Sequence, residues 1–290
     1  MRVVVIGGNG QLGSDVVEVF QKRGDDVRPL THVDIELANL DSVTTCLQGL
    51  APALVVNTAA MHHVEQCEQQ PEKAFAVNAI GSRNLAIVTR DLGAALLHVS
   101  TDYVFNGEKG EPYVEEDAPL PLNVYGNSKL AGEEFVRTLN PKHFVLRTSA
   151  IYGKQPCRAK GGRNFVELML KLGSERGAVR VVDDEVVTPT ATAQIAVQIR
   201  ELSGSEAYGL YHATAEGMCS WYEFAREIFK AADMRVDVQV AGPNEFPSKI
   251  PRPKYSVLEN RGLKRLGLNR FAAWQEGLQQ YLRERSVLVA

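Results

Sequence analysis

The sequence predicts an α/β protein with a Rossmann-type, doubly wound parallel sheet and a smaller, mixed α/β lobe. Three observations support this fold class. The β-branched segment 2–6 leads directly into a glycine-rich turn and a helix. Short apolar strands then alternate with amphipathic helices as far as about residue 150, and small or polar residues follow the predicted strands. Such alternation is typical of a parallel sheet with helices on both faces.

Composition narrows the class of protein. The chain has 290 residues and a formal net charge of −3, with no basic stripe, which disfavours nucleic acid or an anionic membrane as a partner. Its 4 cysteines form no C-x-x-C pair, as expected for reduced thiols rather than disulfides or a zinc site. Neither a signal peptide nor a membrane-spanning run is visible, so we expect a cytoplasmic protein.

The first strand is followed by a glycine-rich turn and then by apolar residues at helical spacing. The glycines fit G-x-x-G-x-x-G through Gly7, Gly10 and Gly13, or G-x-G-x-x-G if Gly8 replaces Gly7. A strand, glycine turn and helix together let a phosphate approach the backbone at the positive end of the helix dipole. A purely structural turn is the alternative. We predict that a dinucleotide binds here, on Gly7, Gly10, Gln11, Leu12 and Gly13.

The second strand, Val27–Leu30, is expected to lie beside the ribose of that dinucleotide. An acidic residue about 20 positions after the glycines would favour NADH. Asp34 has this spacing but is expected to lie past the end of the strand. Thr31 and His32 at the strand end are neither clearly acidic nor clearly cationic, so the choice between NADPH and NADH stays open.

The third and fourth predicted strands, 53–57 and 95–99, end at the same edge of the sheet. Small residues after the third strand, Ala59 and Ala60, would let a cofactor lie flat over this edge. A long helix, 71–92, carries Asn78 between the two strands. The fourth strand leads to Ser100 and Thr101, and we expect the Thr101 hydroxyl to lie where a carbonyl substrate would bind.

A polar, proline-rich loop, 107–121, precedes a helix that contains Tyr125 and Lys129. Residues four apart share one face of a helix. An ammonium beside a phenol favours the phenolate, so we expect Lys129 to lower the pKa of Tyr125 from about 10 toward neutrality. Such a phenol is a general acid for a carbonyl oxygen. The Y-x-x-x-K spacing alone also arises by chance, and it gains weight only beside a hydride donor.

The alternation weakens after the fifth strand, 143–147. We predict that residues 1–150 and 184–215 form the dinucleotide-binding Rossmann domain. Residues 151–183 and 216–290 are expected to form a discontinuous substrate-binding lobe, with the substrate between the two.

The chain resembles the extended short-chain dehydrogenase/reductase family. The resemblance rests on the glycine motif, the hydroxyl of Thr101 and the Tyr125–Lys129 pair, in this order and spacing. It narrows to the dTDP-4-dehydrorhamnose reductase group and spans nearly the whole chain. The motifs shared with that group include the segments 100–107, 125–133, 147–149, 164–166, 183–185 and 252–258.

The resemblance implies an NAD(P)H-dependent reduction of a keto group on a nucleotide-linked deoxysugar, with dTDP-4-dehydrorhamnose as the expected substrate. Tyr125 would protonate the forming alkoxide, Lys129 would also hold the nicotinamide ribose, and Thr101 would orient the carbonyl. The cofactor-binding positions would be Gly7, Gly10, Gln11, Leu12, Gly13, Thr31, Ala59, Ala60, Asn78, Ser100, Tyr125 and Lys129. The substrate-binding positions would be Thr101, Asp102, Tyr103, His62, Ala150, Asn164, Glu185 and Arg252.

Departures from the group gather at the sugar end. Ala150 stands where the group usually has a tryptophan that packs on the sugar, a loss of apolar contact worth about 1–3 kcal/mol. The A-A-Y-T pattern after the third strand is replaced by Ala59 and Ala60 followed by Met61-His62-His63, and the usual glutamine is Glu185. His62 and His63 either refill the space left by the tryptophan or are simple loop residues. The activity class is therefore better supported than the substrate.

Two other functions share these motifs. A sugar-nucleotide epimerase or dehydratase uses the same tyrosine and lysine, although Tyr103 after Asp102 favours a simple reductase. A non-catalytic regulatory subunit resembling the β subunit of methionine adenosyltransferase is the third possibility. A homodimer is expected as a possible assembly. Some members of the group bind magnesium between subunits near the position of Asp15, but a lone carboxylate in a first helical turn is usually a dipole partner, so we predict no metal.

Overall fold

The computed structural model describes residues 1–157, 161–242, 245–246 and 249–289. Its main feature is a parallel sheet of 6 strands in the order β10-β5-β4-β3-β1-β2, which confirms the predicted fold class. The chain reverses its direction of travel across the sheet between β1 and β3, and ligands of doubly wound sheets bind at such a point. The strands of this sheet are β1 (Arg2–Ile6), β2 (Asp26–Leu30), β3 (Leu54–Asn57), β4 (Ala95–Thr101), β5 (His143–Thr148) and β10 (Gly209–His212).

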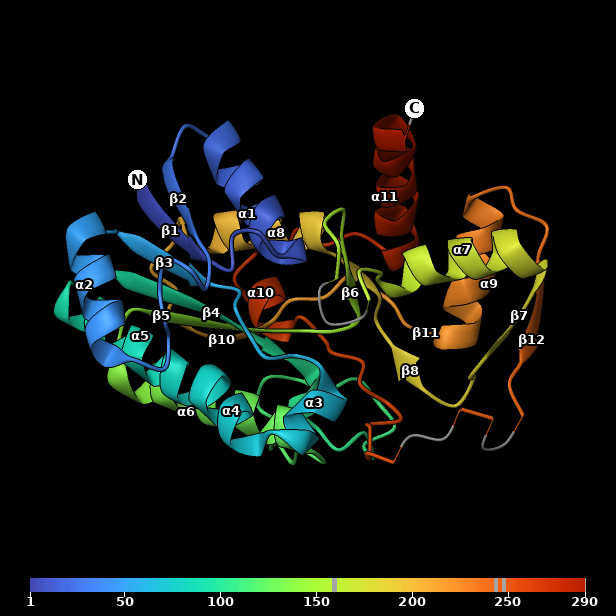
Figure 1. Ribbon diagram of the computed structural model, residues 1–290, viewed down its shortest axis with the longest axis horizontal. Helices are drawn as coiled ribbons and strands as arrows, with labels where there is room; N and C mark the ends of the chain where they lie inside the picture. The colour runs from blue at the N-terminus through green and yellow to red at the C-terminus, as the bar shows by residue number, and fades with distance from the viewer. Residues whose placement is uncertain (158–160, 243–244, 247–248, 290) are drawn as a thin grey trace.

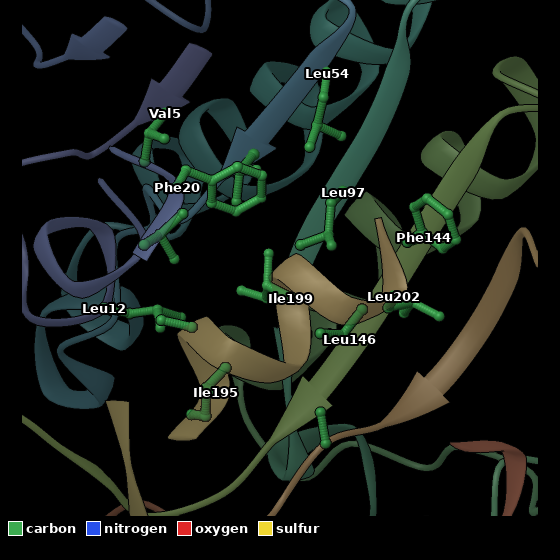
Figure 2. Packing of buried hydrophobic residues seen from close by; sticks show 14 of the residues in the cluster. Val5, Leu12, Phe20, Leu54, Leu97, Phe144, Leu146, Ile195, Ile199 and Leu202 are labelled. Atoms are coloured by element: carbon green, nitrogen blue, oxygen red, sulfur yellow. The ribbon is translucent and has the colours of Figure 1, made fainter. Parts of the chain in front are cut away.

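Helices cover both faces of this sheet because its strands are apolar on both sides. Val3 and Val5 belong to one core cluster, whereas Val4 and Ile6 belong to the other, as the strand period of two requires. Figure 2 shows the first cluster, in which Phe20 and Ile199 pack among the side chains of the strands. The covering helices are α1 (Gln11–Lys22) and α8 (Thr192–Leu202) on one face, and α2 (Leu40–Leu50), α5 (Gly81–Asp91) and α6 (Val124–Leu139) on the other (Figure 1).

A third core cluster lies in the C-terminal part of the chain, to the right in Figure 1. Aromatic side chains dominate it, including Tyr152, Phe224 and Trp274. The two-stranded pairings here are β12-β7, β11-β8 and β6-β9. The elements are β6 (Ile151–Tyr152), α7 (Phe165–Arg176), β7 (Ala178–Val181), β8 (Val186–Val187), β9 (Thr190–Ala191), β11 (Cys219–Ser220), α9 (Trp221–Ala231), β12 (Asp237–Val240) and α11 (Trp274–Val289). The short helix α10 (Arg261–Arg265) instead packs against β10, and its Leu263 belongs to the cluster that contains Val3 and Val5.

The helix predicted over residues 71–92 is one helical stretch with a widened turn in its middle. It comprises α4 (Pro71–Phe75), the π-helical segment η1 (Ala76–Ile80) and α5. Elements that were not predicted include α3 (Val64–Gln69), the 3₁₀ turn η2 (Asp102–Val104) and, after residue 232, β12, α10 and the long helix α11. Among the described residues, we find no helix with the length and apolar character needed to cross a membrane.

The close packing of α6 against η1 gives the first prediction. A Cβ at Gly132 would lie 2.3 Å from the backbone oxygen of Asn78. We therefore expect Gly132→Ala to lower the free energy of unfolding by about 1–3 kcal/mol, because α6 must move away. Chemical denaturation measures this change.

Gly49→Ala is the matched control. Gly49 also lies in a helix, but a Cβ there meets no heavy atom within 4 Å. Its replacement should leave stability unchanged or raise it by up to about 1 kcal/mol through helix propensity. Equal effects at the two glycines would contradict the packing argument.

Candidate active site

The glycine turn lies at the carboxyl ends of β1 and β3. Gly7 has φ of +77°, and a Cβ there would lie 2.8 Å from the Thr58 hydroxyl and 3.1 Å from the backbone nitrogen of Ala59. At Gly13 a Cβ would lie 2.1 Å from the backbone oxygen of Gly7. Both positions therefore require glycine, and they bring the first turn of α1 against the end of β1.

The N-terminus of α1 suits an anionic group. Its N-cap is Gly10, which has no side chain to cap the helix, and its first turn has no acidic residue. The first amides of a helix have no intrahelical acceptor, so they remain available to a phosphate. The residues therefore fit the pyrophosphate of a nicotinamide dinucleotide. Gln11 donates from Nε2 to the Gly153 carbonyl at 3.2 Å, and Leu12 is buried in the core.

The helix α6 brings Tyr125 and Lys129 to the same edge. Its N-cap, Asn123, accepts a hydrogen bond from the backbone N–H of Gly126 at 2.9 Å. A Cβ at Gly126 would lie 2.2 Å from the backbone oxygen of Tyr103, so this glycine lets α6 approach η2 closely. The Tyr125 and Tyr103 rings consequently meet edge to face, with centroids 5.6 Å apart. Lys129 is buried and donates to the Val99 carbonyl at 2.7 Å.

Thr101 occupies the end of β4 beside these two groups. Its hydroxyl donates to Oδ1 of Asp102 at 3.0 Å, accepts from the backbone N–H of Tyr103 at 3.2 Å, and hydrogen-bonds the Tyr125 phenol. Asp102 is buried and is held in turn by the Ser149 hydroxyl at 2.8 Å. Asp102 thus holds the Thr101 hydroxyl in place, so the role that these contacts indicate for Asp102 is positional.

The electrostatics of Tyr125 differ from the sequence-based expectation. Burial raises the pKa of Tyr125 above its usual value, and the hydrogen bond between Tyr125 and Thr101 only partly opposes this. The prediction that Lys129 brings this pKa toward neutrality is therefore wrong. Instead, the lysine is the group whose pKa moves toward neutrality, because burial lowers the pKa of Lys129 to about 8 while the Glu133 carboxylate opposes the shift. An isolated buried ammonium is costly, and the shift expresses that cost.

A buried ion pair ties α6 to the sheet. Glu133 accepts from Nη2 of Arg147 at 2.6 Å and from its Nε at 3.0 Å, and both side chains are almost completely buried. The Ser100 hydroxyl donates to the same carboxylate at 2.5 Å. Ser100, which was predicted to bind the cofactor, thus uses its hydroxyl proton in a hydrogen bond to Glu133 of α6. Glu133 lies on the same face of α6 as Tyr125 and Lys129, about two helical turns after Tyr125.

Asn78 is similarly committed. Its Oδ1 accepts from the backbone N–H of Met61 at 2.8 Å, and its Nδ2 donates to the Met61 carbonyl and to the Ser128 hydroxyl, both at 2.9 Å. The widened turn of η1 places this amide between the loop after β3 and α6. Its structural role is clear, whereas cofactor binding by Asn78 stays a prediction.

Three predicted substrate residues lie close together. The charges of Arg252 and Glu185 both act on the phenol of Tyr103, and burial raises the pKa of Tyr103. Arg252 forms an ion pair with Glu65, while its buried Nε has no hydrogen-bond partner among the described residues. A guanidinium with a free N–H is suited to a phosphate, which would compete with Glu65.

The remaining predicted positions are more varied. Asn164 caps α7 and donates to the Gly153 carbonyl and the Tyr281 hydroxyl, so a nucleotide would have to replace one of these bonds. Thr31 donates to Asp34, which lies past the end of β2 as expected. Ala150 adopts φ of +45°. His63 caps α3, and the exposed His62 has Nε2 3.9 Å from the Cys157 sulfur, so neither has a shown role in refilling the sugar wall.

Two residues near the predicted site, Trp221 and His98, could not be identified from the sequence. Trp221 begins α9 and donates from Nε1 to Glu185 at 3.2 Å, which brings an aromatic ring next to the predicted sugar site. Its distance in sequence from the motifs hid it. His98, in the middle of β4, lies 3.2 Å from the amino group of Lys129. The apolar context of the strand gave no signal for a site residue there.

Comparison with known proteins agrees with this geometry. Residues 1–287 match the protein family described as the RmlD substrate binding domain. The spore coat polysaccharide biosynthesis protein SpsK of Bacillus subtilis is 39% identical over 285 residues, which cover 98% of each chain. The dTDP-4-dehydrorhamnose reductase of Escherichia coli is 31% identical over 300 residues, again covering 98% of each chain. A crystal structure of dTDP-4-dehydrorhamnose reductase from Bacillus anthracis in complex with NADP has a TM-score of 0.93 at 39% identity, covering 98% of this chain and 99% of that one.

The ion pair under α6 gives a prediction of stability. Glu133→Gln removes the negative charge and leaves Arg147 buried without a counter-charge, so we expect a loss of about 3–5 kcal/mol in the free energy of unfolding. Urea denaturation of the purified variant measures it.

The neighbouring residue provides the control. Glu134 forms an ion pair with Arg137 at 2.7 Å, but its side chain is 53% exposed. Glu134→Gln should cost less than about 0.5 kcal/mol because the pair is solvated. A small loss at both positions would show that the buried pair does not secure α6.

Proposed function

The chain belongs to the RmlD substrate binding domain family and is a nucleotide-sugar reductase of the short-chain dehydrogenase/reductase type, and we propose that it reduces dTDP-4-dehydrorhamnose to dTDP-rhamnose. Either NADPH or NADH would be the hydride donor. The reductase of Bacillus anthracis binds NADP, which favours NADPH. A cytoplasmic homodimer stays a prediction.

The observation that carries the proposal is the meeting of three groups beside the glycine turn. Thr101 ends β4, Tyr125 hydrogen-bonds it from α6, and Lys129 lies one helical turn further along. A hydroxyl, a phenol and an amine at this edge can stabilise and protonate an oxygen that becomes negative during carbonyl reduction.

Each group has a separate task in the proposed reaction. The bound nicotinamide supplies the hydride, and the protein supplies position, a proton and charge stabilisation. Thr101 orients the carbonyl oxygen by donating its hydroxyl proton there instead of to Asp102, its acceptor in this structure. Tyr125 gives its phenolic proton to that oxygen, and because burial raises its pKa, it carries this proton at neutral pH. Lys129 then stabilises the phenolate that remains.

The nucleotide half of the substrate would bind through Arg252. Its Nε is buried without a hydrogen-bond partner among the described residues, and its guanidinium lies against Glu65 at the surface of the site. A diphosphate carries more charge than one carboxylate and accepts a bidentate pair of hydrogen bonds, so it can displace Glu65. The sugar would then lie near Tyr103, Glu185 and Trp221.

The substrate proposal is tested with a panel of keto-deoxysugars linked to dTDP, GDP and UDP. Oxidation of NADPH and of NADH is followed by absorbance, and the product is identified by NMR. We expect stoichiometric loss of NADPH with the dTDP-linked substrate and much slower turnover with the others. Preference for a GDP- or UDP-linked sugar would refute the proposed substrate but leave the reductase assignment intact.

The chemical role of Tyr125 is tested by Tyr125→Phe. Loss of a general acid typically slows a reaction by about 10²- to 10⁴-fold. We expect turnover to fall by this factor while the dissociation constant of NADPH, measured by fluorescence titration, stays nearly constant.

Tyr208→Phe is the matched control. It removes a phenolic hydroxyl at the far end of the sheet, where the centroids of the Tyr208 and Phe144 rings are 5.0 Å apart. It should leave turnover unchanged. If Tyr125→Phe kept most of its activity, the assignment of the proton donor would be wrong.

A further inference from the structure

A buried histidine contacts the amino group of Lys129, and no step described above uses it. His98 lies in β4, three residues before Thr101, and is 1% exposed. Its Nε2 is 3.2 Å from Nζ of Lys129, and its Nδ1 is 3.1 Å from Nδ2 of Asn57. Burying an imidazole costs free energy unless its ring nitrogens form hydrogen bonds.

The sheet itself fixes the ring. Asn57 ends β3 and is the register partner of His98 in the neighbouring strand, so both side chains project from the same face of the sheet. The Ser82 hydroxyl of α5 lies 3.5 Å from Nδ1 on the third side. Two neighbouring elements, β3 and α5, thus hold His98 below α6, and its third side-chain contact is Lys129.

The hydrogen bonds also define which nitrogen carries the ring proton. The backbone N–H of Ala59 donates to Oδ1 of Asn57 at 3.2 Å, so Nδ2 of that amide faces His98. Nδ1 of His98 is therefore an acceptor, and its proton resides on Nε2, facing Lys129. An N–H that faces an amino group favours the neutral amine, and an ammonium there requires the ring proton to move. The protonation of His98 and Lys129 is thereby coupled.

We propose that His98 is a positioning residue, which holds the amino group of Lys129 at the catalytic edge and couples the protonation of that amine to the ring proton of His98, whose place Asn57 fixes. The proposal deepens the reductase function above and rests on it for the role of Lys129. As a neutral amine, Lys129 donates one N–H to the Val99 carbonyl and accepts the ring N–H of His98 on its lone pair. Its remaining N–H is then the one left for the cofactor.

The charges around Lys129 agree with this arrangement. Burial lowers the pKa of His98 well below its usual value, and the nearby lysine adds to this effect, so the ring is neutral. On α6 itself, the titratable groups are Tyr125, one turn earlier, and Glu133, whose charge is balanced by Arg147 of β5. His98 is the titratable group that β4 presents to the lysine, so replacing His98 should change the pKa of Lys129 directly.

The first test needs no sugar substrate. NADPH dissociation constants are measured by fluorescence titration for the wild type, His98→Leu, Lys129→Met and the double variant. If His98 acts through Lys129, the double variant binds NADPH as Lys129→Met does, with no added loss. Independent, multiplying effects of the two substitutions would overturn the proposal. Because this readout requires only NADPH, its failure is distinct from a wrong choice of sugar nucleotide.

The second test follows the charge of Lys129. Its side-chain NMR signal, assigned by its absence in Lys129→Met, is titrated with pH in the wild type and in the His98 variants. We expect a clear change of the titration midpoint in His98→Leu and a smaller one in His98→Gln, which keeps a polar side chain. The pH profile of kcat should move with it, and kcat should fall by about 10- to 100-fold in His98→Leu. A midpoint that does not move in either variant would overturn the proposal.

Folding and a neighbouring histidine supply the controls. Thermal unfolding of both His98 variants shows whether the fold survives, and His98→Gln provides the readout if His98→Leu does not fold. His143 begins the adjacent strand β5 and bonds only the Asn140 carbonyl, at 2.7 Å, among its described contacts. His143→Gln should change neither the titration of Lys129 nor the affinity for NADPH.

Discussion

The buried contact between Arg147 and Glu133 determines where the proposed catalytic residues lie. It joins β5 to α6, and the Ser100 hydroxyl adds β4 to the same carboxylate. Buried ion pairs contribute little net stability, but they restrict geometry, since no other position satisfies both charges. α6 can therefore sit on the sheet in only one register, and Tyr125 and Lys129 reach the edge where β4 ends. Without this anchor, a helix packed by apolar contacts alone could slide.

Small residues give this anchor its precision. Gly126 and Gly132 allow α6 to touch the backbone of η2 and η1, where any Cβ would collide. The widened turn at η1 then turns Asn78 toward both the loop after β3 and α6. The proposed catalytic positions are thus held by close backbone approach and by buried hydrogen bonds. This explains why several residues next to the cofactor edge have their hydrogen bonds directed into the protein.

The sequence predicted the sheet, the glycine turn and the Tyr125–Lys129 helix because each has a local pattern: apolar alternation, glycine spacing or helical periodicity. It could not predict the partners of single polar residues, which depend on contacts between distant segments. Ser100, for example, lies beside the expected cofactor edge, yet it bonds Glu133, 33 residues away. Trp221 reaches Glu185 only because α9 folds back over the lobe. The pKa of Tyr125 was misjudged for the same reason, since burial is a property of the fold.

The charge states of Tyr125 and Lys129 suit a reductase. Carbonyl reduction needs an acid that still holds its proton when the hydride arrives, and burial secures this by raising the pKa of Tyr125. After proton transfer, the phenolate that remains is buried. The free-energy cost of burying this charge is offset by a nearby positive charge. Lys129, with a pKa of about 8, can carry that charge at neutral pH and can also release it. A lysine held by a neutral ring and a carbonyl, rather than by a carboxylate, leaves its charge available to the phenolate. The burial that raises the pKa of Tyr125 therefore keeps the proposed general acid protonated until the hydride arrives.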